Sequence, residues 1–228
     1  MRRLFFFLIL PLLFLPVRAS ETKYVALTFD DGPSGMFTQR LLDGLYDRGA
    51  KATFLLCGYR ITQYPEVAQR IFEEGHEIGI HGYSHKTMKG MSRRSIAQEI
   101  LDTEDLLPEG CRAVFLRPPG GFLTDPVVDV AKARGMPILK WSVDPKDWAT
   151  DDAAAIEGAV LSRIQDGDVV LLHDLSDSSV NAALAIVEKL QEQDFEFVTV
   201  SELARIRRAN LTPGQEYKAF PRGEGGTA

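Results

Sequence analysis

The chain has 228 residues, a net charge of −6, and 45% hydrophobic residues. This length and composition suit one domain with a sizeable core. The acidic balance, with no basic cluster beyond Arg205, Arg207 and Arg208, excludes the electrostatic footprint of a nucleic-acid-binding protein. We therefore expect a single globular domain, a monomer, with no nucleic-acid partner.

The first 19 residues have the layout of a secretory signal peptide. Positive charge at Met1–Arg3 precedes an apolar run that Pro11 interrupts and that ends at the small residue Ala19. The run is shorter than the roughly 20 apolar residues that a membrane span needs. We expect cleavage after Ala19, no stable membrane span, and a secreted or cell-envelope location. An uncleaved membrane anchor is the alternative.

Strand and helix patterns alternate along the rest of the chain. Apolar, β-branched or aromatic runs predict strands at 24–29, 52–57, 77–80, 113–116, 138–143, 169–172 and 195–198. Helical periodicity lies between them, at 37–46, 65–73, 93–106, 126–134, 153–164, 180–191 and 200–207. Seven strand-plus-helix units imply a parallel sheet with covering helices, either doubly wound or closed into a barrel. We place this domain at 20–211 and a partly mobile tail at 212–228.

The two cysteines, Cys57 and Cys111, fall at opposite ends of the predicted parallel strands. A strand length on the order of 17 Å would separate them, whereas bridged Cα atoms lie within about 7 Å. We expect two buried, unpaired thiols rather than a disulfide.

Polar residues follow five of the predicted strands at their carboxyl ends. They are Asp30 and Asp31; His81 and His85; Arg117; Asp144, Asp147 and Trp148; and His173 and Asp174. In parallel α/β folds, ligands and catalytic groups gather at this rim. The convergence of five strands on one rim predicts an active site there.

The spacing of His81 and His85, four residues apart, suits two ligands of one metal ion. A His-x-x-x-His pair alone is weak support, but a carboxylate from the first strand would complete a His₂-Asp set with an open position. The remaining aspartate could then act as a base and His173 as an acid in hydrolysis. We expect His76, at the opposite rim, to be structural.

Five strings carry a family resemblance: TFDDGP, HGYSH, RPPGG, DPKDW and LLH. In this order and spacing they resemble the motifs of the polysaccharide deacetylases, the NodB-homology domain of carbohydrate esterase family 4. The match runs from about Tyr24 to Leu203. The resemblance implies a distorted (β/α)₇ barrel with parallel strands that removes N-acetyl groups from a glycan with a divalent metal, commonly Zn²⁺ or Co²⁺.

The resemblance also implies a role for each motif residue. Asp30 would be the general base, oriented by Arg117, and Asp31 would bind the metal with His81 and His85. Which aspartate takes which role rests on the family match and not on the strand pattern.

The later motifs would supply the acid and the substrate contacts. His173 would be the general acid, held by Asp147. Trp148 and either Leu171 or Leu172 would line the acetyl pocket, although an indole also fills barrel cores. A backbone N–H after Pro119 would help to hold the oxyanion. We include Gly120 and Tyr83 as substrate contacts, with a packing role open for Tyr83.

Three residues depart from the family pattern. Gly82 replaces the Ser or Thr whose hydroxyl steadies the loop of the second histidine, and Ser84 offers the nearest substitute. Gly120 stands where a Tyr is frequent, which would widen the site, and Pro145 replaces a small residue. All the chemical groups remain, so we expect an active enzyme.

We expect an exported metal-dependent deacetylase of N-acetylated glycans, with peptidoglycan or chitin-type oligomers as substrates. An O-acetyl esterase acting on xylan-like glycans and a non-catalytic glycan-binding barrel are the alternatives.

Overall fold

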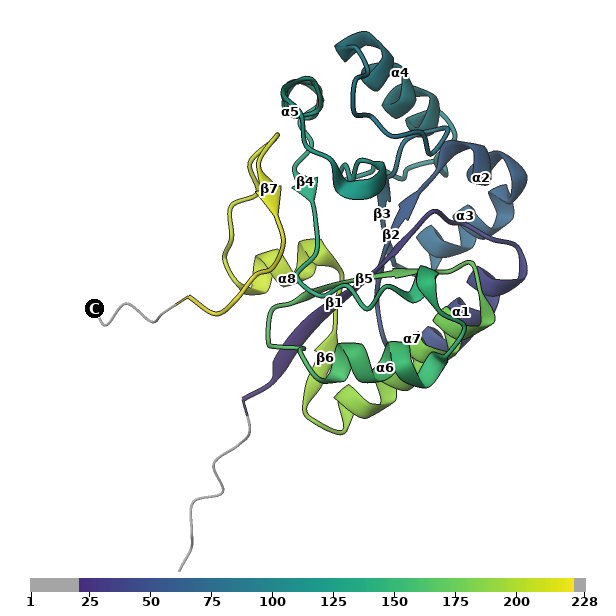
Figure 1. Ribbon diagram of the computed structural model, residues 1–228, viewed down its shortest axis with the longest axis vertical. Coiled ribbons are helices and arrows are strands. Elements are labelled where there is room, and N and C mark those ends of the chain that lie inside the picture. Colours follow the sequence, from purple (N-terminus) through teal and green to yellow (C-terminus); the bar gives the residue numbers. More distant parts are fainter. Residues whose placement is uncertain (1–20, 224–228) are drawn as a thin grey trace, which may run out of the picture.

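The computed structural model describes residues 21–223, so the predicted signal peptide lies outside the described residues. Strands meet at the centre of the molecule and helices surround them (Figure 1). The strands are β1 (Lys23–Asp30), β2 (Thr53–Leu56), β3 (Glu77–Ile80), β4 (Ile138–Leu139), β5 (Val169–His173), β6 (Phe195–Phe197) and β7 (Glu216–Tyr217). The α-helices are α1 (Met36–Asp47), α2 (Gly58–Gln63), α3 (Pro65–Glu73), α4 (Arg93–Glu104), α5 (Asp125–Ala133), α6 (Ala153–Leu161), α7 (Asp177–Gln191) and α8 (Val200–Ile206). Two short 3₁₀ turns are η1 (Pro119–Gly121) and η2 (Asp147–Ala149).

The central sheet is parallel and closes into an irregular barrel. Its strand order is β3-β2-β1-β5, and β6 pairs with the first residues of β1. Isolated parallel bridges from Leu116 to Ile80 and Ile138 continue the wall beyond β3. A further bridge between Val143 and Val170 joins the segment after β4 back to β5. The predicted distorted barrel of parallel strands is thereby confirmed.

The segment predicted as the fourth strand, 113–116, is not a regular strand. Only Leu116 forms bridges, one to each neighbouring segment. Pro137 on the neighbouring segment has no N–H to donate, although its carbonyl accepts from Leu116. The ladder is therefore interrupted on that side of the barrel wall.

The core lies on both faces of β1. Val25, Leu27 and Phe29 pack in the largest hydrophobic cluster, whereas Ala26 packs in another. Burial on both faces is expected for a parallel strand covered by helices. Phe29 stacks on Phe54 of β2 with ring centroids 5.3 Å apart, and burying such a ring stabilises the fold by roughly 1.5–3 kcal/mol. The carboxyl end of β1 is thus a rigid support for the residues that follow.

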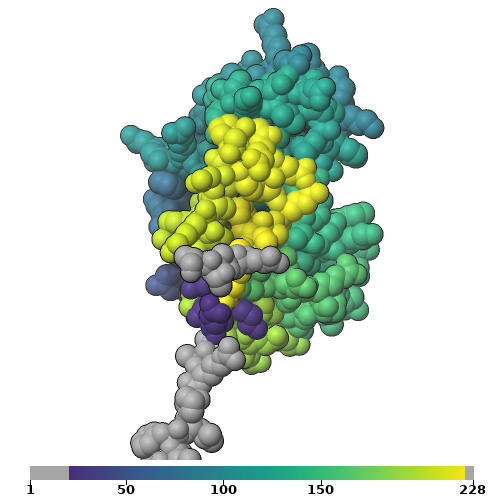
Figure 2. Space-filling model, turned by 90° about the vertical axis from the view of Figure 1, so that its left-hand side faces the viewer, coloured from purple at the N-terminus to yellow at the C-terminus, as the bar shows by residue number. Residues whose placement is uncertain are grey.

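The described part of the C-terminal segment, up to Gly223, packs on the barrel. β7 pairs with β4, and Phe220 is buried in the same hydrophobic cluster as Leu139. Figure 2 shows this segment, in yellow, lying across one face of the molecule. Arg222 also pairs with Asp166, so both apolar and ionic contacts hold the segment. Among residues 21–223, no helix is long and apolar enough to cross a membrane.

The two cysteines are free, in agreement with the sequence prediction, although only Cys57 is fully buried. Burial raises the pKa of the Cys111 thiol to about 11.

His76 is buried away from the other three histidines, and its Nδ1 accepts a hydrogen bond from the Ala52 N–H at 3.1 Å. Burial lowers the pKa of His76 to about 4, so it stays neutral and structural, as predicted.

Candidate active site

A cleft of about 390 Å³ opens at the carboxyl ends of the strands. It is lined by the aspartates, histidines and aromatic residues that follow β1, β3 and β4, together with β5. These lining residues are Asp30, Asp31, His81, His85, Gly120, Trp141, Asp144, Trp148, Leu171 and His173. The predicted convergence of separate strands on one rim is therefore what the structure shows.

A sharp turn brings the two adjacent aspartates to the same cleft. Asp30 is the last residue of β1, and Asp31 adopts a left-handed backbone with φ 71°. Asp tolerates this region better than most residues do. A cis peptide bond between Gly32 and Pro33 follows. Because the strand direction ends at Asp30, the usual alternation of faces stops and both carboxylates reach the cleft.

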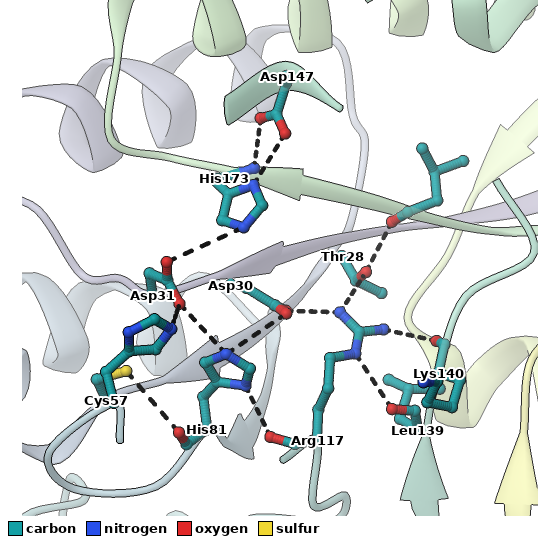
Figure 3. A network of polar contacts seen from close by, with 12 residues as sticks. Thr28, Asp30, Asp31, Cys57, His81, Arg117, Leu139, Lys140, Asp147 and His173 are labelled. Carbon is teal, nitrogen blue, oxygen red and sulfur yellow. Dashed lines mark hydrogen bonds and ion pairs between the residues drawn. The ribbon is translucent and has the colours of Figure 1, made fainter. Parts of the chain in front are cut away.

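Asp30 lies in a buried network of hydrogen bonds (Figure 3). The Nη1 of Arg117 donates to Asp30 Oδ1 at 2.6 Å and to Thr28 Oγ1 at 2.9 Å. The same guanidinium donates to the main-chain carbonyls of Leu139 (3.2 Å) and Lys140 (2.7 Å). Arg117 has no exposed surface, so its charge is matched by Asp30 and by fixed dipoles rather than by water.

Asp31 has a different set of neighbours. Its Oδ1 lies 2.9 Å from His85 Nε2 and 3.2 Å from His81 Nε2, and it is buried without a well-aligned hydrogen bond. The Nδ1–H of His81 donates to the carbonyl of Arg117 at 2.7 Å, which assigns the lone pair of neutral His81 to Nε2. A carboxylate oxygen and an imidazole lone pair then face each other. A cation between them would satisfy both, so this donor set fits a divalent metal ion.

The charges in this triad are strongly coupled. Burial by itself would raise the pKa of Asp31, but its contacts with His81 and His85 outweigh burial and hold that pKa well below the ordinary value. The contact with Asp31 in turn raises the pKa of His85. Asp31 is therefore ionised throughout the physiological range, as a metal ligand must be.

His173 faces this group from β5 and is held by Asp147. The Nδ1–H of His173 donates to Asp147 Oδ1 at 2.8 Å, and the backbone N–H of His173 donates to Asp147 Oδ2 at 2.7 Å. Burial lowers the pKa of His173, but the bond to Asp147 and the charges of Asp30 and Asp31 outweigh it and raise the pKa to about 9. The imidazole is thus protonated at neutral pH and can donate a proton.

Three of the four predicted substrate contacts line the cleft. Trp148 is 67% exposed, so it is not a core aromatic. Leu171 lines the cleft, whereas Leu172 is buried in the main core. Gly120 also lines the cleft, with φ 69°. Tyr83 is not among the lining residues. A Cβ at Gly58 would lie 2.4 Å from its ring, which places the Tyr83 ring against α2.

Two residues of the site carried no functional prediction. Thr28 supports Arg117 from within β1, and its hydroxyl donates to the Val170 carbonyl at 2.6 Å. Trp141 lines the cleft within 5.6 Å of the Arg117 guanidinium, measured to the ring centroid. Both sit inside segments predicted as strands, where the sequence pattern does not tell which face a side chain occupies. Asp144, one of the polar residues expected at this rim, also lines the cleft and accepts from the Lys146 N–H.

The chain is similar to known proteins in both sequence and structure. The sequence profile described as "Polysaccharide deacetylase" matches residues 18–139. A peptidoglycan-N-acetylglucosamine deacetylase of Bacillus cereus is 39% identical over 82% of this chain and 91% of its own length. The peptidoglycan-N-acetylmuramic acid deacetylase PdaC of Bacillus subtilis is 36% identical over 82% of this chain, which spans only 40% of PdaC.

A solved structure agrees with the sequence comparisons. A family 4 acetyl xylan esterase from Clostridium thermocellum, solved with a cobalt ion, has a TM-score of 0.81 and 31% identity, covering 87% of this chain and all of that one. The predicted family and enzyme class are confirmed. With a profile match over more than half of its length and relatives at 36–39% identity over 82% of it, the chain belongs to the polysaccharide deacetylase family.

Proposed function

We propose that this protein is a metal-dependent deacetylase that hydrolyses N-acetyl groups of amino-sugar glycans and releases acetate. The observation that carries this proposal is that three groups with different chemical properties share one cleft. A bonded carboxylate, a metal-fitting triad and a protonated imidazole all face the same space, at Asp30, Asp31 and His173. Amide hydrolysis requires a base, a polarising group and an acid in that arrangement.

Asp31, His81 and His85 would hold the metal ion, with Zn²⁺ or Co²⁺ both suited to this donor set. When bound, such an ion polarises the acetyl carbonyl and lowers the pKa of a bound water. The second oxygen of Asp30, 3.7 Å from His81 Nε2, lies beside this position. Asp30 can therefore receive the proton of an attacking water in the cleft.

The remaining steps fall to groups of the chain itself. Water oxygen bonds to the acetyl carbon as Asp30 takes its proton, and negative charge develops on the carbonyl oxygen. The first backbone N–H after Arg117 belongs to Gly120, because Pro118 and Pro119 have none. No acceptor among the described residues takes it, so it is available to the oxyanion. The C–N bond then breaks and the amine leaves with the proton of His173.

The shape and surroundings of the cleft favour a polymeric substrate. Trp148 is exposed beside the cleft, where a sugar ring could stack on the indole. Relatives that act on peptidoglycan and chitooligosaccharides make peptidoglycan or chitin-type oligomers the substrates that we propose. Such substrates lie outside the cytoplasm or at the cell envelope, which agrees with the signal-peptide pattern at residues 1–19.

Removal of O-acetyl groups is a second candidate function. The same tetrahedral chemistry serves esters, and the acetyl xylan esterase described above shares this fold at a TM-score of 0.81. The two candidates differ only in the leaving group, which is an alcohol in the ester and an amine in the amide. A leaving amine needs protonation more than an alcohol does, so the protonated His173 favours the amide.

The test is acetate release from N-acetylglucosamine oligomers and from peptidoglycan by the full chain loaded with Zn²⁺ or Co²⁺. Acetylxylan serves as the competing substrate. We expect release from the amides, loss of release with a chelator, and recovery when metal is restored. Faster release from acetylxylan would assign the protein to the esterases. Binding of oligomers without any acetate release would indicate a glycan-binding barrel instead.

A further inference from the structure

The loop between His81 and His85 is held from two sides. Its carbonyls, at Gly82 and Tyr83, accept from the N–H groups of Gly58 and Tyr59 at the start of α2, at 3.1 and 3.0 Å. Its amides point the opposite way, toward α4. The backbone of the loop is therefore fixed only if α4 supplies an acceptor for them.

Glu99 on α4 supplies that acceptor. Its Oε2 accepts from the backbone N–H groups of Tyr83 and Ser84, both at 2.8 Å, and its Oε1 accepts from the Ser84 hydroxyl at 2.7 Å. Three bonds to one carboxylate make a strong and directional contact. Ser84, expected as a substitute for the missing hydroxyl at position 82, thus acts through Glu99 rather than on the histidines.

Gly82 and Glu99 fit each other sterically. A Cβ at Gly82 would lie 3.3 Å from Glu99 Oε2 and 3.3 Å from Met88 Cε, and Gly82 has φ 83°. A side chain at position 82 would therefore strain the backbone and crowd the carboxylate. In this chain, the loop combines a glycine with an external carboxylate where the family pattern has a Ser or Thr inside the loop.

The two histidines depend on the loop to different degrees. The ring of His81 is anchored by its Nδ1–H bond to the Arg117 carbonyl. His85 has no comparable anchor among the described residues; its ring contacts Asp31, and its backbone is left-handed with φ 57°. The orientation of the His85 ring is therefore set by the loop backbone, which Glu99 fixes.

We propose that Glu99 is a positioning residue that holds the His81–His85 loop in its metal-binding conformation. This inference rests on the proposed function, because it takes His81 and His85 to be metal ligands. Residues that support metal ligands from outside typically change metal affinity by about 10–100-fold when mutated. Glu99 should act on affinity for the ion rather than on the chemistry that follows.

The test compares Glu99→Ala and Glu99→Gln with the parent, using Glu104→Gln as a matched control. Glu104 lies on the same helix but pairs with Arg134, away from the loop. Cobalt affinity is measured by competition with a chelator, and the visible Co²⁺ spectrum reports the ligand geometry. We expect the Co²⁺ dissociation constant of Glu99→Ala to rise about 10–100-fold with an altered spectrum. The dissociation constant of Glu99→Gln should fall between those of the parent and Glu99→Ala. That of Glu104→Gln should stay within about twofold of the parent value.

Amide hydrogen exchange gives a readout that does not depend on metal. The Tyr83 and Ser84 amides should exchange at least about tenfold faster in Glu99→Ala, whereas the Leu55 amide in β2 should not change. If Glu99→Ala does not fold, Glu99→Gln and Ser84→Ala, which removes one of the three bonds, carry the test. Parent-like Co²⁺ affinity in the folded Glu99 variants overturns the proposal.

The outcomes separate this inference from the proposed function. Weaker Co²⁺ binding in Glu99→Ala, with no acetate release from the loaded parent, supports the positioning role and overturns the deacetylase proposal alone. Parent-like Co²⁺ binding in Glu99→Ala, with acetate release by the loaded parent, overturns the positioning role and supports the deacetylase proposal. A parent that binds no Co²⁺ overturns both.

Discussion

The two adjacent aspartates are chemically identical and share one cleft, yet their bonding partners differ. Asp30 is buried and bonded to Arg117, which is itself bonded to a hydroxyl and two main-chain carbonyls. Asp31 is more exposed, and its buried Oδ1 faces imidazole nitrogens without a well-aligned hydrogen bond. One carboxylate is already neutralised by a protein cation, whereas the other presents the donor set for a cation that must come from solution.

This difference shows how a single turn separates two functions. Because Asp31 leaves the strand with a left-handed backbone, its carboxylate reaches the histidines that follow β3, while Asp30 stays against the barrel wall. Metal binding by Asp30 itself is disfavoured, because one of its carboxylate oxygens is bonded to Arg117. Its other oxygen remains available to a proton.

The largest effect is expected from Asp30→Asn. The amide cannot take a proton from water, so kcat should fall by about 10²–10⁴-fold. The triad of Asp31, His81 and His85 is unchanged, so metal content should stay that of the parent. Acetate release and metal analysis on the same sample check both parts. Retention of more than a tenth of the parental kcat would exclude Asp30 as the base.

Arg117→Met removes the cation that balances Asp30. An unpaired buried carboxylate would remain, and breaking such a pair costs about 3–5 kcal/mol of folding free energy. Denaturant unfolding should show this loss, with Arg40→Met as the control because Arg40 pairs with Asp177 at the surface. Equal losses in the two variants would contradict the special role assigned to the buried pair.

Asp147→Asn tests the acid on the opposite wall of the cleft. A general acid works in its protonated form, so activity should be full below the pKa of His173 and fall as pH rises through about 9. A bound cation offsets the charge of Asp31. The alkaline limb of the pH–activity profile of the metal-loaded enzyme should therefore lie at or below about pH 9. Without the Asp147 charge, burial and the bound cation should bring the pKa of His173 to the ordinary value of about 6.5 or below, which costs at least roughly fourfold in activity at pH 7. An alkaline limb that does not move in Asp147→Asn would rule out His173 as the group whose titration produces it.

The smallest effect is expected at the exposed rim. Trp148→Ala removes a stacking surface but no reacting group, and aromatic contacts of this kind are worth about 0.5–1 kcal/mol, or roughly 2–5-fold in KM. The value of kcat should change less than KM. A loss confined to kcat would instead place the indole in the chemical step.

Much of this arrangement was predictable from the sequence, and the exceptions have physical causes. Alternating strand and helix patterns predicted the barrel, and the motif residues after the strands predicted the cleft. The fourth strand was expected to be regular, but Pro137 lacks the N–H that a full ladder needs. The supporting roles of Thr28 and Glu99 were missed, because they depend on contacts between segments distant in the chain.

The central claim is that Asp31 binds the metal and Asp30 does not, and a cobalt titration of Asp30→Asn and Asp31→Asn tests it most directly. We expect the parent and Asp30→Asn to bind one Co²⁺ with similar affinity. Asp31→Asn should lose at least about 100-fold in affinity, because its amide replaces the only carboxylate of the triad. Co²⁺ binding that survives in Asp31→Asn and is lost in Asp30→Asn would contradict the account.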